Sequence, residues 1–346
     1  MQQITRFILF PAIIGGVLGL GIITFNSNSD DRPGYAAAVA AAAPAVVNIY
    51  STKVTQSNML CRIPAYRDLC RAFGAEPQVQ NSLGSGVIVS RDGYVLTNQH
   101  VVEEADEILV MFANNQTTTA TVIGSDTHTD LAVIKVAATG LPVIPLLDDD
   151  QPRVGDIALA IGNPFGLGHS VSQGIISAFS RTIITNSPYD DFIQTDAAIS
   201  PGNSGGALVD HEGRLLGINT MIYSQSGGSE GIGFAIPADI AMWVMEQIVT
   251  YGRVIRGWLG VSLTPQPLPN SQYGLRVTAI SRGGPAQAAG LRLGDVILSV
   301  NQQPASNAYS TTLVIANTKP GDTIDIEVMR NQERFRTTAI AAELPP

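Results

Sequence analysis

The sequence predicts a mainly β protein, because short strand-like runs recur along it and only one long helix stands out. The chain of 346 residues contains 34 glycines and 20 prolines, which is typical of a fold with many turns. Polar turns such as residues 91–93 (Arg-Asp-Gly) and 211–213 (His-Glu-Gly) separate many of the runs. Only residues 238–251 have apolar side chains near helical spacing, and Gly252 ends that helix. This combination favours barrels or sandwiches over alternating β/α units.

The predicted strands fall into two groups, which at this chain length indicate separate domains. The first group covers residues 45–50, 84–90, 94–97, 107–112, 119–124, 132–136, 157–161, 170–176, 192–194, 206–209, 215–220 and 233–236, and the second covers 296–300 and 323–329. A short helix is expected within residues 35–43, and another between Pro285 and Gly290. We therefore predict a first domain at residues 35–250 and a second at 255–343.

Composition excludes several classes of function. The formal net charge of −9 and the absence of a dense Lys/Arg run argue against nucleic acid as a partner. No GxxxxGK[ST] sequence is present, so an ATP-driven machine is not expected. The two cysteines form no CxxC or Cys/His cluster, so zinc is not expected either. We predict no metal and no cofactor.

The N-terminal segment is a candidate membrane anchor. Residues 7–25 contain no charged side chain, and as a helix they would span about 28 Å, close to the hydrocarbon thickness of a bilayer. A cleaved secretory signal is the alternative, although its apolar region is usually only about 7 to 15 residues long. Arg6 precedes the segment and two aspartates follow it, so the positive-inside rule places the N-terminus in the cytoplasm. We expect an anchor at residues 1–25, a polar linker at 26–34 and a periplasmic or extracellular body.

Cys61 and Cys70 lie in a long irregular segment, residues 57–80. In an oxidising compartment the two thiols would form a disulfide that stiffens this loop. Two buried free thiols are the alternative.

The sequence Gly-Asn-Ser-Gly-Gly at residues 202–206 predicts a nucleophile loop. Glycines on both sides of Ser204 permit positive φ and let a substrate approach the hydroxyl closely. The N–H groups of Gly202 and Ser204 would point at one spot, as an oxyanion hole requires. A plain glycine turn between two strands is the alternative, so the prediction depends on a base and an acid elsewhere in the chain.

His100 is the candidate base, because it follows a predicted strand whose end holds it in place. The other three histidines, at positions 128, 169 and 211, fit surface or core roles. The loop that feeds the apolar strand at 132–136 contains two candidate acids, Asp126 and Asp130. A triad acid must be buried enough to orient imidazole, which favours Asp130 because it adjoins the apolar run. Asp126 remains the alternative.

Five segments resemble the HtrA (Deg) family of serine proteases. Residues 97–102 (Thr-Asn-Gln-His-Val-Val), 129–135 (Thr-Asp-Leu-Ala-Val-Ile-Lys) and 202–206 look like its three catalytic motifs in the same order. Residues 160–165 and 231–237 are also similar to stretches of that family. The chain order His, Asp, Ser is that of chymotrypsin-like folds.

This resemblance implies a chymotrypsin-like double β-barrel, with His100 as base, Asp130 as orienting acid and Ser204 as nucleophile. Ala198 lies where such folds place the specificity-pocket residue, and with Ile218 near it the pocket would be small and apolar. Cleavage after Val or Ala is the expectation.

The C-terminal domain resembles a PDZ domain. Its residues Trp258, Leu259, Gly260 and Val261 stand where the family has its carboxylate-binding loop. Successive N–H groups there would hold the terminal carboxylate of a peptide that adds to the domain as a strand. A glycine-containing strand start without a ligand is the alternative.

The order of anchor, protease domain and single PDZ domain resembles the DegS branch of the family. That likeness implies a homotrimer in the inner membrane that senses C-termini of misfolded outer-membrane proteins and cleaves an RseA-like anti-sigma factor. It also implies that Arg181 relays PDZ occupancy to the oxyanion loop, although a solvated loop arginine is the alternative. The loop with the two cysteines is more like that of DegP, so a broad quality-control protease or chaperone is the second expectation.

Overall fold

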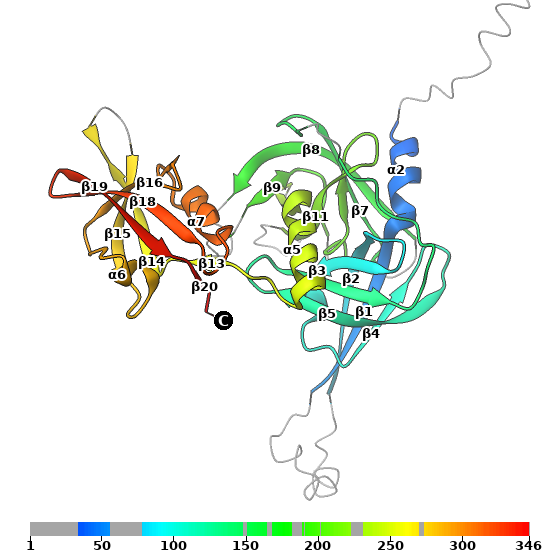
Figure 1. The fold of residues 1–346 in the computed structure, drawn as a ribbon. Helices are drawn as coiled ribbons and strands as arrows, with labels where there is room; N and C mark the ends of the chain where they lie inside the picture. Colours follow the sequence, from blue (N-terminus) through cyan, green and yellow to red (C-terminus); the bar gives the residue numbers. More distant parts are fainter. Residues whose placement is uncertain are drawn as a thin grey trace, which may run out of the picture. The chain divides into compact units, whose positions relative to one another are not determined.

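A computed structural model describes residues 34–55, 78–147, 151–164, 168–181, 189, 191–200, 202–222, 231–269 and 273–345 (Figure 1). Within those residues no helix combines the length and the hydropathy needed to cross a bilayer. The predicted anchor at residues 7–25 lies outside the described residues, as do Cys61 and Cys70. The anchor and the disulfide therefore stay predictions.

The first six strands form a closed antiparallel barrel in the order β1-β2-β3-β6-β5-β4, which we call the N-terminal barrel (Figure 1). They are β1 (Val46–Thr55), β2 (Gln78–Ile88), β3 (Tyr94–Asn98), β4 (Glu107–Met111), β5 (Thr117–Asp126) and β6 (Leu131–Val136). Pairing of β1 with β4 closes it. Alternation in β4 buries Ile108 and Val110 and exposes their neighbours, as a half-buried strand requires.

The next six strands form a second closed barrel, the C-terminal barrel, in the order β10-β11-β12-β9-β8-β7 (Figure 1). They are β7 (Ile157–Gly162), β8 (Ser170–Arg181), β9 (Phe192–Thr195), β10 (Ala207–Val209), β11 (Leu215–Ile222) and β12 (Gly233–Pro237). Its core combines small and branched side chains, namely Ala158, Ala160, Ile176, Ile193, Ala197, Ile199, Leu208, Leu216 and Ala235. The predicted double β-barrel is confirmed.

Few helices occur among the described residues of this part of the chain. They are α2 (Ala36–Ala42), the 3-10 helix η1 (Ala43–Ala45), α4 (Gln99–Val102) and α5 (Ala238–Tyr251). The long helix predicted at 238–251 is therefore confirmed. Gly252 ends it with φ +75° and donates its N–H to the Ile248 carbonyl (2.8 Å), a left-handed cap that favours glycine. The helix packs on β5, where a Cβ on Gly124 would lie 2.8 Å from the Ile248 side chain.

The C-terminal residues form a separate β-rich domain. Its elements are β13 (Gly257–Trp258), β14 (Val261–Pro267), β15 (Tyr273–Ile280), α6 (Pro285–Ala288), β16 (Val296–Val300), β17 (Gln303–Pro304), α7 (Ala308–Ala316), β18 (Thr323–Arg330), β19 (Glu333–Ile340) and β20 (Ala342–Glu343). The main sheet has the order β14-β15-β16-β18-β19, so β14 is an edge strand. Pro285 begins α6 as predicted.

Several elements of this domain were not predicted. Helix α7 contains Thr, Val and Ile residues, whose branching lowers helix propensity and hides the helical pattern. The signal that could have found it is Asn307, whose side chain accepts the Tyr309 N–H at 2.8 Å as an N-cap. Strands β14, β15 and β19 are interrupted by polar residues or prolines and lack a continuous apolar run.

Candidate active site

Three candidate residues are brought to the place where the two barrels meet. Strand β3 ends at Asn98, and the single turn of α4 that follows carries His100. Asp130 lies directly before β6, the strand that pairs with β3. Ser204 comes from the loop before β10 of the C-terminal barrel. Residues from both barrels are therefore needed to complete the site.

His100 and Asp130 are in direct contact. The imidazole Nδ1 of His100 lies 2.7 Å from Oδ2 of Asp130, and the backbone N–H of His100 donates to Oδ1 at 3.0 Å. The Asp130 carbonyl also accepts the Gln99 N–H and the Asn98 side-chain amide, each at 3.0 Å. A carboxylate on Nδ1 keeps the proton there and leaves Nε2 as the basic nitrogen, which is the arrangement of a general base.

Asp130 is held in an unusual backbone conformation. Its φ is +54°, in the left-handed region that non-glycine residues rarely adopt. Its side chain is 22% exposed, while that of His100 is 47% exposed. The hydrogen bonds on its carboxylate and carbonyl offset the cost of this conformation, and such strain is common at functional sites.

Thr220, which the sequence does not predict as a site residue, also contacts the Asp130 carboxylate. Its hydroxyl donates to Oδ2 of Asp130 at 2.9 Å, and its backbone carbonyl accepts the Ser204 hydroxyl, also at 2.9 Å. The Ser204 hydroxyl therefore points at Thr220 in this structure rather than at His100. Nothing in the local sequence of β11 marks Thr220, because its role depends on a partner 90 positions away.

The loop around Ser204 requires its glycines. Gly202 has φ +96°, and a Cβ there would lie 2.7 Å from the Pro164 Cβ. Gly205 has φ +82°, and a Cβ there would lie 2.1 Å from the Ser85 carbonyl oxygen. Both the positive φ and the close approach exclude a side chain, so the predicted glycine loop has a steric reason.

Asp126, the alternative acid, has a different partner. Each of its two carboxylate oxygens accepts a hydrogen bond from one terminal guanidinium nitrogen of Arg256, with an N–O distance of 2.7 Å in both cases. Both residues are buried. Burial alone would raise the pKa of Asp126, but the hydrogen bonds and charge of Arg256, with the Thr129 hydroxyl, hold its pKa below the ordinary carboxyl value. The Arg256 guanidinium also lies 4.7 Å from the centre of the Tyr189 ring. The structure thus places Asp130, and not Asp126, against His100.

The residues predicted for a specificity pocket occupy different environments. Ala198 is exposed, and its carbonyl accepts the Ser172 hydroxyl at 2.6 Å. Ile218 is fully buried in β11, opposite Ala207 and Ile236. The contacts of the described residues neither join Ala198 to Ile218 nor outline a pocket around them, so the small apolar pocket stays a prediction.

The predicted carboxylate-binding loop connects β13 to the edge strand β14. Leu259 is buried, and its carbonyl accepts the Ala286 N–H at 2.9 Å. Gly260 has φ +78°, and its carbonyl accepts the Ser281 N–H at 2.9 Å. The loop is therefore fixed from two sides next to a strand with a free edge, which is the geometry needed to add a peptide strand. The backbone of Arg181 ends β8, but its side chain lies outside the described residues.

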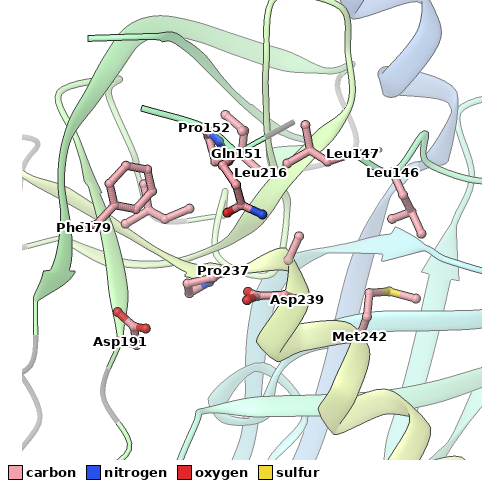
Figure 2. Close-up of a pocket in the computed structure, with 12 residues that line it drawn as sticks. Leu146, Leu147, Gln151, Pro152, Phe179, Asp191, Leu216, Pro237, Asp239 and Met242 are labelled. Atoms are coloured by element: carbon pink, nitrogen blue, oxygen red, sulfur yellow. The ribbon is translucent and has the colours of Figure 1, made fainter. Parts of the chain in front are cut away.

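A separate cavity of about 330 Å³ lies in the protease domain (Figure 2). Figure 2 shows Asp239 and Met242 of α5 on one side of it and Phe179 of β8 on another. Its full lining is Leu146, Leu147, Gln151, Pro152, Phe179, Asp191, Ile193, Leu216, Pro237, Ala238, Asp239 and Met242. None of the three candidate side chains lines this cavity. In the described part of the chain, no three His, Cys, Asp or Glu side chains are grouped so as to hold a metal.

Two closed barrels with a His–Asp pair and a serine where they meet define the class of trypsin-like serine peptidases. The profile of the trypsin-like peptidase domain matches residues 84–218, and that of the PDZ domain matches residues 247–329. The chain is therefore a serine endopeptidase with one PDZ domain.

Comparison with known proteins gives the family. Serine endoprotease DegS of Haemophilus influenzae is 41% identical over 350 residues, covering 97% of this chain and 98% of that protein. DegS of Escherichia coli K12 is 39% identical, covering 93% and 89%. A probable periplasmic DegP-like endoprotease of Halomonas elongata is 40% identical, covering 95% and 75%. A solved HtrA-type protease, AlgW with a tripeptide, is 46% identical with a TM-score of 0.79, covering 91% and 98%. The chain belongs to the HtrA (Deg) family of serine endoproteases.

Proposed function

We propose that the chain hydrolyses peptide bonds through a triad of His100, Asp130 and Ser204. The observation that carries this is the 2.7 Å contact between His100 Nδ1 and Asp130, to which two hydrogen bonds through Thr220 connect Ser204. Asp126 does not compete for the imidazole, because its carboxylate is bound by Arg256.

The proposed mechanism follows from these contacts. The Ser204 hydroxyl rotates from the Thr220 carbonyl towards Nε2 of His100, which takes its proton as Oγ attacks the substrate carbonyl. Asp130 stabilises the imidazolium that forms, and the N–H groups of Gly202 and Ser204 bind the oxyanion. His100 then protonates the leaving amine. Water takes the place of that amine: it gives a proton to His100 and attacks the acyl group, and His100 returns a proton to Ser204 as the acid is released. With Ala198 and Ile218 forming the specificity pocket, cleavage occurs after Val or Ala.

The PDZ domain supplies the proposed regulation. We infer that Trp258, Leu259, Gly260 and Val261 bind the C-terminal carboxylate of a misfolded outer-membrane protein while its chain pairs with β14. The fixed loop and the free strand edge support this, as does the solution of related AlgW structures with a tripeptide and with a decapeptide. Occupancy is relayed through Arg181 so that the Gly202 and Ser204 N–H groups form the oxyanion hole only in the liganded state.

The proposed setting is the bacterial envelope. Residues 1–25 anchor a homotrimer in the inner membrane, with the N-terminus in the cytoplasm and both domains in the periplasm. The substrate is an RseA-like anti-sigma factor, cleaved in an envelope stress response. Two DegS proteins are 41% and 39% identical to this chain over most of its length, and this similarity supports the role. The second candidate is a broad quality-control protease or chaperone for unfolded proteins, which the identity to a DegP-like protein supports.

Labelling with an organophosphate tests the chemistry, because only an activated serine reacts. The wild-type chain should be labelled at Ser204, and Ser204→Ala should lose both labelling and cleavage while its fold is retained. Cleavage by Ser204→Ala would overturn the assignment of the nucleophile, whereas a wild-type chain that takes no label at Ser204 would favour a chaperone or scaffold.

A library of peptides with free C-terminal carboxylates tests the regulation. Under the sensor proposal, some of these peptides raise the cleavage rate of a fixed substrate. If none does, while unfolded proteins are degraded, the quality-control function is favoured.

A further inference from the structure

Ser85 lies in β2 of the N-terminal barrel and is fully buried. Ser85 contacts residues of both the N-terminal barrel and the C-terminal barrel. Its backbone N–H donates to the Ser204 carbonyl at 2.8 Å, and its hydroxyl donates to the Gly202 carbonyl at 2.7 Å. One residue therefore binds the carbonyls of the same two residues whose N–H groups are proposed to bind the oxyanion.

The hydroxyl of Ser85 has a defined orientation. Its oxygen accepts the backbone N–H of Asn163, at the end of β7, at 2.9 Å. Because that donor occupies one lone pair, the hydroxyl proton is directed at the Gly202 carbonyl. The Ser85 carbonyl in turn accepts the Thr97 hydroxyl at 2.7 Å. All of the polar groups of Ser85 are thus satisfied in a buried site, where unmade hydrogen bonds are costly.

These contacts fix two peptide groups of the nucleophile loop at both ends. The peptide after Gly202 is held through its oxygen by Ser85 and through the Asn203 N–H, which donates to the Ser200 carbonyl at 2.9 Å. The peptide after Ser204 is held through its oxygen by Ser85. The N–H of that peptide, on Gly205, donates to Asn219 at 2.7 Å and completes the restraint.

The peptide between these two is the one that carries the Ser204 N–H. Its oxygen, on Asn203, accepts the Gly206 N–H at 2.9 Å. The Ser204 N–H itself has no hydrogen-bond acceptor among the residues that the structure describes. Restraint on both sides therefore fixes the direction of a donor that stays available, which is what a preorganised oxyanion site needs.

We propose that Ser85 is a positioning residue for the oxyanion-binding N–H group of Ser204. This proposal rests on the assignment of Ser204 as nucleophile. Ser85 touches neither substrate nor reacting atoms and acts through the loop. Without its hydroxyl, the peptide after Gly202 loses one of its two restraints, and the Ser204 N–H on the adjacent peptide loses its alignment.

Ser85→Ala in the full chain tests this, because it removes the hydroxyl and keeps the backbone bond to Ser204. Peptide hydrolysis should show kcat reduced about 10- to 100-fold with KM within about twofold, since the N–H group that Ser85 positions binds the oxyanion mainly when its charge develops. Affinity for a peptide boronate, which forms the tetrahedral adduct at the serine, should fall by a similar factor. Ser85→Cys retains a weak donor and should lie between Ala and the wild type.

Thr195→Val is the matched control. Thr195 is fully buried, and its hydroxyl also donates to one backbone carbonyl, of Ile175, and accepts one backbone N–H, of Ala197. It should lose a comparable amount of thermal stability while boronate affinity is kept. Equal losses of kcat and boronate affinity in Thr195→Val and Ser85→Ala would overturn the proposal, as would unchanged kcat in a folded Ser85→Ala.

Ser204→Ala separates the assignment of Ser204 as nucleophile from the role of Ser85. Cleavage by Ser204→Ala would refute the nucleophile itself. An inactive Ser204→Ala alongside a fully active Ser85→Ala would refute only the role of Ser85. If Ser85→Ala does not fold, Ser85→Cys carries the test, and wild-type kcat in that variant counts against the proposal.

Discussion

Arg256→Met tests the ion pair that removes Asp126 from the candidate site. In the wild type, two guanidinium nitrogens each lie 2.7 Å from an Asp126 oxygen, and the two side chains are only 5% and 6% exposed. Removing the guanidinium leaves a buried carboxylate that keeps, among the described residues, the hydrogen bonds from Thr129. Breaking a buried pair in this way costs about 3–5 kcal/mol of unfolding free energy.

The same pair predicts a pH dependence with a definite sign. Because the pKa of Asp126 is lowered in the folded state, its contribution to stability is present above the unfolded carboxyl pKa of about 3.9. That contribution is lost as the pH falls through the folded pKa. In Arg256→Met, burial acts without the guanidinium and raises the Asp126 pKa, so the variant regains part of its deficit when the carboxylate is protonated. The difference from the wild type should therefore be largest near neutral pH and smaller near pH 4.

Urea unfolding at pH 7 and pH 4 measures both effects, and a double-mutant cycle isolates the pair. Asp126→Asn keeps an oxygen for Thr129 and removes the charge, so the double variant should recover about 1–3 kcal/mol relative to the sum of the single changes. Purely additive losses, or a cost below about 1 kcal/mol for Arg256→Met at pH 7, would refute the reasoning.

Three further predictions concern the candidate site and the PDZ loop. Thr220→Val removes the hydroxyl that donates to the Asp130 carboxylate. Steady-state hydrolysis should then show kcat lowered about 10-fold with little change in KM. An unchanged kcat would show that Asp130 needs no such support. Gly205→Ala should abolish organophosphate labelling and lower the melting temperature. The new Cβ would lie 2.1 Å from the Ser85 carbonyl oxygen, and the positive φ at this position strains alanine by about 1–3 kcal/mol. A labelled, stable variant would contradict the loop geometry. A C-terminal peptide should bind at least about 10-fold more weakly after amidation, measured by calorimetry, if the backbone around Gly260 binds its carboxylate; equal affinity would place the ligand elsewhere.

Patterns within one element were readable from the sequence. The helix that begins at Ala238 and stops at Gly252 was predicted because apolar spacing and a glycine cap both act within a few residues. The loop at 202–206 was predicted because positive φ and close backbone approach both require glycine. Helix α7 was missed because its branched residues resemble a strand locally and its packing decides otherwise.

Contacts between residues of different elements could not be predicted from such local patterns in the sequence. Thr220 reaches Asp130 across 90 positions, and Ser85 reaches Gly202 across 117. Neither serine nor threonine in a strand carries a local mark of such a partner. These contacts arise because each barrel closes on itself and the two then share one boundary.

The sequence by itself determined the class of fold, the glycine-rich loop that holds the candidate nucleophile, and the order of the candidate His, Asp and Ser. These depend on composition, spacing and glycine stereochemistry, which act locally. Only the tertiary structure decided that Asp130 contacts His100 while Asp126 binds Arg256, and that Ser85 and Thr220 surround the serine. The physical reason is that a carboxylate or hydroxyl takes its role from the partner within hydrogen-bond distance, and strand pairing across the chain sets that partner.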